Sequence, residues 1–351
     1  MRRILLFFLL FFPLIAAGEP EEVRLAAEAR RVLSEPEQHA GFGVGTKPVR
    51  GFTFNVRLAV KRDGESFRTI LISKDCVPEE GWVVSCGRNG SGELNGVNTP
   101  YSVKEPAGYK VYALRRVVGA KGGSPREVVY TPFIHEIATP EVKAHGRNYL
   151  RSLISLALTD LRMYEVRSRA GDIFVADHVT VDFLEKLAVI EHIDHDRFAV
   201  EKMEDLAGEV YAILAFNRED AYIYAVSRAG ARGLFQFMPE TYKMLLKKYS
   251  EARLEKDFVR GTANPLNSIK KTVLLTDYHI SLLPPDLRGT ILALPTFYEE
   301  YGGASHNGGP GRAIKLLRLG KDLEKENPNN ENRIFVAKLR ALRDLLNPVR
   351  F

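Results

Sequence analysis

The feature that most constrains the fold is a change in hydrophobic period near residue 139. From Gly51 to about Ile134 the chain has short runs rich in β-branched and aromatic residues, separated by Gly, Pro, Asp and Asn: FTFNVRLAV, FRTILIS, GWVVSC, YKVYALRRVV and REVVYTPFI. Such runs predict strands. After Pro140 apolar residues recur at spacings of three and four, which predicts helices. The sequence therefore predicts an α+β protein, with a small β-rich domain of five or six strands followed by an α-helical domain.

The length of the chain also favours two domains. Its 351 residues exceed the usual size of a single hydrophobic core. We expect a β-rich domain over 18–139, with a lead-in helix in its first part, and a helical domain over 140–351. The β-rich domain has no recognisable catalytic cluster, so we expect it to pack, to bind cell wall or to bind an envelope protein partner.

The first seventeen residues have the composition of an export signal. Arg2 and Arg3 precede an apolar run from Ile4 to Ile15, and Ala16-Ala17 supply the small residues of a cleavage site. A membrane anchor is the alternative, but a spanning helix needs roughly 20 apolar residues. We therefore expect residues 1–17 to be a signal peptide. The rest of the chain is then exported, to the periplasm or cell envelope.

Two cysteines, Cys76 and Cys86, are the only ones in the chain. In an oxidising compartment such a pair predicts one disulfide that closes a short loop. A two-ligand metal site is the alternative, although no histidine lies nearby in the sequence.

The formal net charge of +6 indicates a mild attraction to polyanions, which include nucleic acids, anionic lipids and wall polymers. No dense basic tract with interleaved aromatic residues is present, and an exported protein meets cell wall before nucleic acid. We expect no nucleic-acid partner.

A glycine-rich segment, AVSRAGARGLFQFMPETY, runs from Ala225 to Tyr242. Its glycines would let the backbone approach a ligand closely, and the Gln236 amide can both donate and accept hydrogen bonds. A tight turn before a helix would explain the glycines but not Gln236. The segment resembles the lytic transglycosylase pattern A-x-S-x-x-G-A-x-G-L-x-Q-x-x-P-x-T, with Phe235 where Met is commoner. The matching residues are Ser227, Gly230, Ala231, Gly233, Leu234, Gln236, Pro239 and Thr241.

Two further segments support the same resemblance. SHNGGPGRAIKLL, from Ser305 to Leu317, is similar to the family's A-Y-N-A-G-P-G-R segment, and NPLNSIKK, from Asn264 to Lys271, is a weaker match to its Asp-Pro-x-x-Asn-Ile helix start. His306 stands where the family usually has a Tyr beside the catalytic acid. The resemblance extends from Phe183 to Arg318 and implies a lysozyme-like fold for the helical domain.

Glycosidic cleavage needs a carboxylic acid that keeps its proton near neutral pH. In the family this acid is a Glu at the end of a helix, and Glu191 is our first candidate. It shares a helical face with four apolar residues, and both burial and the helix C-terminus would raise its pKa. Those four residues are Phe183, Leu184, Leu187 and Ala188. Glu191 lies thirty-six positions before Ser227, so a helical insertion would have to separate them.

Glu219 is the alternative acid, because it lies only eight positions before Ser227, close to the family's usual gap. Its neighbours Asn217, Arg218 and Asp220 are polar, and an adjacent Arg would lower its pKa. We therefore favour Glu191.

The resemblance implies cleavage of the β-1,4 bond between N-acetylmuramic acid and N-acetylglucosamine of peptidoglycan. One Glu would act as acid and then base, without a cofactor, and leave 1,6-anhydromuramic acid ends. Substrate binding is expected from Ser227, Gly233, Gln236, His306 and Asn307. A hydrolytic lysozyme and a non-catalytic glycan-binding envelope protein are the alternatives.

The run HIDHD, His192 to Asp196, also suggests a metal site, since His and Asp are common ligands. No third soft ligand occurs at a recognisable spacing, and a polar loop after a catalytic helix explains the same residues. We expect no metal.

Overall fold

The computed structural model describes residues 18–35, 54–73, 75–88, 94, 96–120, 123–227 and 229–347. The expected signal peptide, residues 1–17, lies outside the described residues. The chain forms two compact units: a sheet unit, 1–147 with 211–218, and a helical unit, 148–210 with 219–351. In the described ranges no helix is long and apolar enough to cross a bilayer. Helices and antiparallel sheets together confirm the predicted α+β class.

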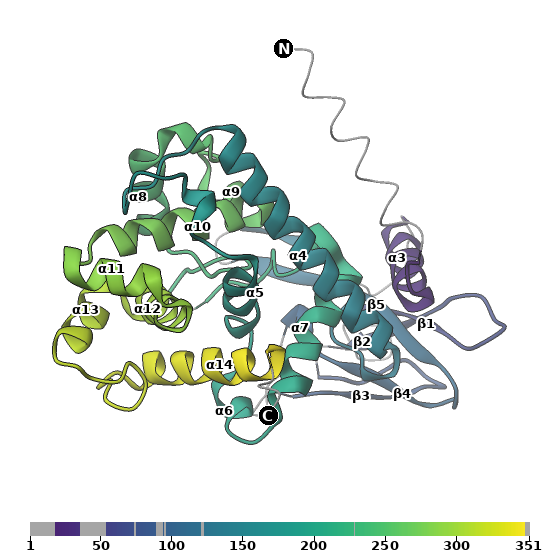
Figure 1. Ribbon diagram of the computed structural model, residues 1–351. Helices are drawn as coiled ribbons and strands as arrows, with labels where there is room; N and C mark the ends of the chain where they lie inside the picture. Colours follow the sequence, from purple (N-terminus) through teal and green to yellow (C-terminus); the bar gives the residue numbers. More distant parts are fainter. Residues whose placement is uncertain are drawn as a thin grey trace, which may run out of the picture. The chain divides into compact units, whose positions relative to one another are not determined.

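The sheet unit contains a four-stranded antiparallel sheet in the order β2-β1-β5-β6 and a two-stranded sheet, β3-β4 (Figure 1). The strand bounds are β1 Phe54–Lys61, β2 Arg68–Ser73, β3 Val83–Cys86, β4 Tyr101–Glu105, β5 Lys110–Ala120 and β6 Gly123–Tyr130. The predicted runs correspond to five of these strands. β4 is not among them, because its sequence YSVKE is short and mostly polar.

One row of side chains crosses the whole four-stranded sheet. Leu58 on β1 lies opposite Ile70 on β2 and Leu114 on β5, and Leu114 lies opposite Tyr130 on β6. All four are buried. The lead-in helix α3, Glu21–Ser34, packs against β5 and β1, and it buries residues spaced three to four apart, as an amphipathic helix does.

The predicted disulfide between Cys76 and Cys86 is confirmed, with the two Cα atoms 6.2 Å apart. It joins the turn after β2 to the end of β3.

The sheet unit extends beyond the boundary that the hydrophobic period predicts. The helix α4, Pro140–Met163, begins at the expected position, but its part up to Arg147 belongs to the sheet unit, as does Tyr211–Arg218 from the end of α7. Two close contacts explain this. A Cβ on Gly146 would lie 1.8 Å from the Tyr211 carbonyl oxygen, and the buried Asn217 amide both accepts from the Thr131 N–H (2.9 Å) and donates to its carbonyl (2.7 Å).

The helical unit is built from a central set of buried helices. Its α-helices, including those shared with the sheet unit, are α4 Pro140–Met163, α5 Val181–Ile190, α6 His195–Phe198, α7 Met203–Asn217, α8 Pro239–Lys248, α9 Phe258–Ala263, α10 Pro265–Ser281, α11 Pro285–Ala293, α12 Pro295–Gly308, α13 Pro310–Arg318 and α14 Asn330–Leu346. Short 3-10 helices occupy Gly96–Asn98, His135–Ile137, Val175–Asp177, Arg218–Asp220 and Ser250–Ala252. α5 and α10 are almost wholly buried, and α14 packs against both α5 and α12 (Figure 1).

The helices α5 and α12 approach closely because α12 carries a glycine at the contact. A Cβ on Gly302 would lie 2.5 Å from the ring of Phe183, so only the missing side chain lets that ring fit. Beside it, the buried Lys186 on α5 donates to the Glu299 carboxylate on α12 at 2.5 Å.

A buried carboxylate, Asp277 on α10, connects three parts of the helical unit. Its oxygens accept hydrogen bonds from the Ser168 hydroxyl, the Arg169 N–H (2.8 Å) and the Tyr249 hydroxyl (2.6 Å), and lie 2.8 Å from His178 Nε2. Burial by itself raises the pKa of Asp277, but these hydrogen bonds, with His178 first, outweigh it and lower the pKa overall.

We predict that Asp277→Asn destabilises the protein by about 3 kcal/mol, because an amide in place of one oxygen turns a donor toward donors that are already buried. Urea unfolding at neutral pH measures the loss. Because the folded pKa is lowered, the contribution of the carboxylate is present above its unfolded pKa of about 3.9 and is lost as the pH falls through the folded value. Asp286→Asn, at an exposed position of α11, is the matched control. An unchanged unfolding midpoint for Asp277→Asn would contradict the prediction.

Candidate functional site

Glu191 lies at the C-terminal end of α5, where its backbone N–H donates to the Leu187 carbonyl at 3.2 Å. The apolar residues that share its face are fully buried, and the Glu191 side chain itself is only 12% exposed. Helix geometry thus holds the carboxylate at the edge of the core, with little contact with water.

His306, on α12, faces this carboxylate. Its Nε2 atom lies 3.0 Å from Glu191 Oε1, and its side chain is 7% exposed. The imidazole stacks on the ring of Phe335, with centroids 6.3 Å apart, and meets the ring of Phe237 edge-on at 6.2 Å. Two aromatic rings therefore hold the imidazole, and the Nε2–Oε1 hydrogen bond can form with the proton on either atom.

The residue after Glu191 connects it to the glycine-rich loop, residues 225–237. The His192 ring stacks on Tyr222, with centroids 3.5 Å apart, and its Nε2 atom lies 3.0 Å from the Leu234 carbonyl oxygen. Burial lowers the pKa of His192 to about 3. At neutral pH the ring is therefore uncharged, and Nε2 carries the proton that it donates to this carbonyl.

Polar side chains of the glycine-rich loop bind the backbone of the loop itself. Ser227 Oγ accepts from the Ala231 N–H at 3.0 Å, and Gln236 Nε2 donates to the Gly233 carbonyl at 2.9 Å. Gln236 has a left-handed backbone, with φ of 46°. Gly233 also has positive φ, and a Cβ there would lie 2.3 Å from the Thr262 carbonyl oxygen. These contacts stabilise the loop; a role of Ser227, Gly233 and Gln236 in sugar binding stays a prediction.

Asn307, near the end of α12, is held by α14. Its Oδ1 atom accepts from Asn332 Nδ2 at 3.2 Å, and the same amide donates to the Ala304 carbonyl at 2.8 Å. A Cβ on Gly308 would lie 2.5 Å from Asn332 Nδ2, so this glycine leaves room for the contact. Asn332 and Phe335 thus belong to the surroundings of the site. The sequence alone does not reveal them, because the amphipathic pattern of α14 indicates only core packing.

Another α14 residue, Lys338, contacts the chain two residues after the candidate acid. It is 1% exposed, its Nζ donates to the Ile193 carbonyl, and it lies 3.2 Å from His195 Nδ1. Burial lowers the pKa of Lys338 to about 8, against the opposite effect of nearby carboxylates that include Asp194 and Glu191. A cation that titrates near neutral pH therefore lies within the electrostatic field of Glu191.

The alternative acid, Glu219, has different surroundings. It lies in the 3-10 helix Arg218–Asp220 and is exposed to solvent. Of the two candidates, only Glu191 has the apolar enclosure that is typical of a proton-donating carboxyl group.

The polar side chains of the HIDHD run make hydrogen bonds to nearby protein groups. Asp194 Oδ1 accepts from the Asp196 N–H (2.8 Å) and the Arg197 N–H (3.0 Å), and so caps α6. His192 and His195 make the contacts given above. Within the described part of the chain, no group of three or more His, Cys, Asp or Glu residues could hold a metal ion.

Comparison of the chain with protein-family models, with curated proteins and with solved structures gives no match. The resemblance to lytic transglycosylases therefore depends on the residue patterns alone.

A second buried lysine, Lys271 on α10, contacts one of the two aromatic rings that hold the His306 imidazole. Its Nζ is 3.9 Å from the centroid of the Tyr242 ring and 4.5 Å from that of Phe237, the ring that meets His306. The side chain is fully buried, and burial lowers its pKa to about 6.

We predict that Lys271→Met stabilises the protein at neutral pH, by at least about 1 kcal/mol. The unfolded lysine has a pKa of about 10.4, so below that pH folding must remove its proton. Wild-type stability should therefore rise from about pH 6 to pH 10, while this rise should be absent from Lys271→Met. Thermal unfolding at several pH values in this window tests the prediction, with the exposed Lys315→Met as control. A less stable Lys271→Met variant would contradict it.

Proposed function

We propose that this chain is a peptidoglycan lytic transglycosylase, with a lysozyme-like fold in its helical unit and Glu191 as its catalytic acid. The observation that carries the proposal is the enclosed Glu191 carboxylate 3.0 Å from His306. His306 occupies the motif position at which the resemblance expects a side chain beside the acid.

The meeting of three separate segments supports the proposal further. The Glu191 helix was assigned from its apolar face, and the glycine-rich loop and the segment that contains His306 and Asn307 were assigned from two different motifs. In the helical unit they touch through His192 and Leu234, through Phe237 and His306, and through the Glu191–His306 pair. A chance match to any one motif would not require the others to lie next to it.

The geometry suggests the following steps. Protonated Glu191 donates its proton to the glycosidic oxygen as the bond between muramyl C1 and that oxygen breaks. The Glu191 carboxylate then takes the proton of the muramyl C6 hydroxyl, and O6 forms the new bond to C1. The acid is thereby restored, no water is consumed, and no cofactor is needed. The acetamido group of the substrate would help at the anomeric carbon, and His306 would hold the carboxyl group in both of its protonation states.

The disulfide agrees with export, because such bonds persist in oxidising compartments. We therefore place the enzyme's action in the periplasm or cell envelope, where its peptidoglycan substrate lies.

We predict that Glu191→Gln abolishes the release of muropeptides from purified sacculi, since an amide of the same shape cannot deliver a proton. The loss should be at least about a hundredfold, with an unchanged circular dichroism spectrum and unfolding midpoint. Glu219→Gln is the matched control and should retain wild-type release. The reverse result would assign the acid to Glu219. A wild-type protein that binds sacculi but releases nothing would favour a non-catalytic glycan-binding protein.

We also predict that the products end in 1,6-anhydromuramic acid. Hydrolysis usually needs a second carboxylate that positions water. Asp194 is the nearest such candidate in the sequence, but its carboxylate already accepts two backbone hydrogen bonds as the cap of α6. Mass spectrometry distinguishes the outcomes, since anhydro products are one water lighter than hydrolytic ones. Products with only reducing ends would make this protein a lysozyme.

A further inference from the structure

One face of α14 contacts the surroundings of the candidate acid. Asn332, Phe335 and Lys338 recur at intervals of three, which places them along one side of a helix. The first two contact the α12 segment that contains His306, and Lys338 contacts the turn that follows α5. Of these three α14 side chains, only that of Lys338 can carry a charge.

Lys338 holds the chain just after Glu191. Its Nζ atom donates to the Ile193 carbonyl and lies 3.2 Å from His195 Nδ1, which can accept a second hydrogen bond from it. The lysine side chain is fully buried, so packing also restrains its stem. Two acceptors and the surrounding core therefore fix the ammonium group beside the turn that begins at Glu191.

The positive charge of this cluster lies on Lys338 and not on His195. Burial lowers the pKa of His195, and the nearby Lys338 ammonium lowers it further. Burial lowers the pKa of Lys338 only to about 8, so the ammonium keeps its proton below that pH. Lys271, the other buried lysine close to the site, has a pKa lowered by burial to about 6 and is mostly uncharged at neutral pH. A neutral His195 ring has one nitrogen without a proton, which suits Nδ1 as the acceptor from Lys338.

Three carboxylates lie within the electrostatic field of Lys338. They are Asp194 in the turn before α6, Glu191 at the end of α5 and Glu331 in the first turn of α14. Asp194 and Glu331 are exposed, so water screens their charges. Asp194 also accepts two backbone hydrogen bonds as the cap of α6. Glu191 is therefore the enclosed carboxylate on which the charge of Lys338 acts most directly.

The ionisable residues of α12 and α10 leave this coupling in place. Glu299 pairs with a lysine of α5, and Glu300 pairs with two arginines of α14. His306 binds the Glu191 carboxylate itself, at 3.0 Å. His279 of α10 lies in the field of His306, but burial lowers its pKa to about 3 and it is uncharged at neutral pH. The groups that act on Glu191 from these two helices are thus either its own partner or neutral.

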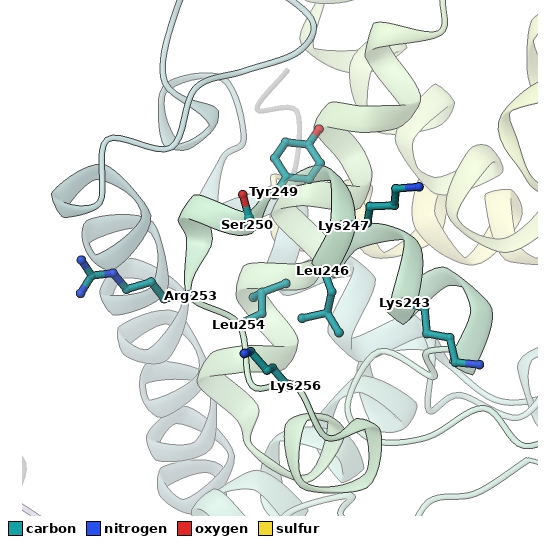
Figure 2. A pocket seen from close by; sticks show the side chains of 8 residues that line it. All are labelled: Lys243, Leu246, Lys247, Tyr249, Ser250, Arg253, Leu254 and Lys256. Carbon is teal, nitrogen blue, oxygen red and sulfur yellow. The ribbon is translucent and has the colours of Figure 1, made fainter.

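A buried cation acts more strongly on a carboxylate than an exposed one does. Figure 2 shows exposed cations, Lys243, Lys247 and Arg253, around a pocket formed by α8 and residues 249–256. Water and salt screen charges of this kind over roughly 10 Å. Protein encloses Lys338, so its charge acts at a lower effective dielectric constant.

We propose that Lys338 is a positioning residue for the catalytic acid: it fixes the turn that begins at Glu191, and its charge favours the carboxylate form of Glu191. This role rests on the proposed function, in which that carboxylate takes the proton of the muramyl C6 hydroxyl. Apolar enclosure favours the protonated form and the nearby cation favours the ionised one. Their opposition lets one carboxyl group both deliver and recover a proton.

The first test measures the charge coupling without any turnover. NMR follows the Cε resonance of Lys338 against pH in protein with labelled lysines, and the loss of this resonance in Lys338→Arg assigns it. In the wild type the resonance should report a pKa of about 8. In Glu191→Gln the midpoint should fall by about half a pH unit, or about threefold in proton affinity, because the opposite charge is gone. The exposed Glu219→Gln is the matched control and should leave the midpoint unchanged. The same midpoint in wild type and Glu191→Gln would overturn the proposal.

The second test measures muropeptide release from sacculi as a function of pH. Lys338→Met removes the charge with little change in volume, so Glu191 should keep its proton to higher pH. The alkaline limb of the profile should then move up by about half a pH unit. Lys338→Arg retains the charge and should keep the wild-type limb, as should Lys325→Met, which removes an exposed charge. A lower rate in Lys338→Met with an unmoved limb would mean that Lys338 is only structural.

The two tests distinguish the failure of this role from the failure of the proposed function. Release by the wild type without coupling in the NMR titration overturns the role of Lys338 alone. No release at any pH overturns the proposed function, and the role of Lys338 with it. Should Lys338→Met not fold, the comparison of wild type with Glu191→Gln still decides, because it leaves the lysine in place.

Discussion

A single buried carboxylate, Asp277, determines how the segments around the candidate site are held. Its partners lie in the segment that precedes α5 and in the residue that follows α8. This one carboxylate therefore fixes two points of the chain. One is the segment just before α5, the helix that ends at Glu191, and the other is the residue just after α8, the helix that follows the glycine-rich loop. Burying a charge is energetically unfavourable unless hydrogen-bond donors surround it. The hydrogen bonds that offset the desolvation of Asp277 therefore also specify one arrangement of the helical unit.

The sequence predicts those parts of the fold that depend on local patterns. Alternation gives the strands of the large sheet, the three-to-four spacing gives the buried face of α5, and the close pair of cysteines gives the disulfide. Contacts between distant residues were not predictable in this way. The membership of Tyr211–Arg218 in the sheet unit depends on Asn217 and Gly146, and neither contact leaves a periodic signal.

The same distinction between local patterns and tertiary contacts applies to the candidate site. Motifs and helix amphipathicity selected Glu191 and His306, but they could not reveal the direction of the Gln236 side chain, which depends on a left-handed backbone in the loop. Nor could they reveal α14, whose Asn332, Phe335 and Lys338 lie around the site although their spacing is that of ordinary core packing. Motifs specify which residue types occur, whereas the directions of their hydrogen bonds come from the tertiary structure.

The contact of Phe183 with Gly302 has a consequence for how such a protein can evolve. A larger residue on α12 would need a smaller one on α5, so these two positions should change together and keep their summed volume nearly constant. Positions 191 and 306 are coupled through a hydrogen bond, which restricts the side chain opposite the carboxylate to those that can share a proton with it. The helices α5 and α12 are therefore coupled at two contacts, by steric fit at one and by a shared proton at the other.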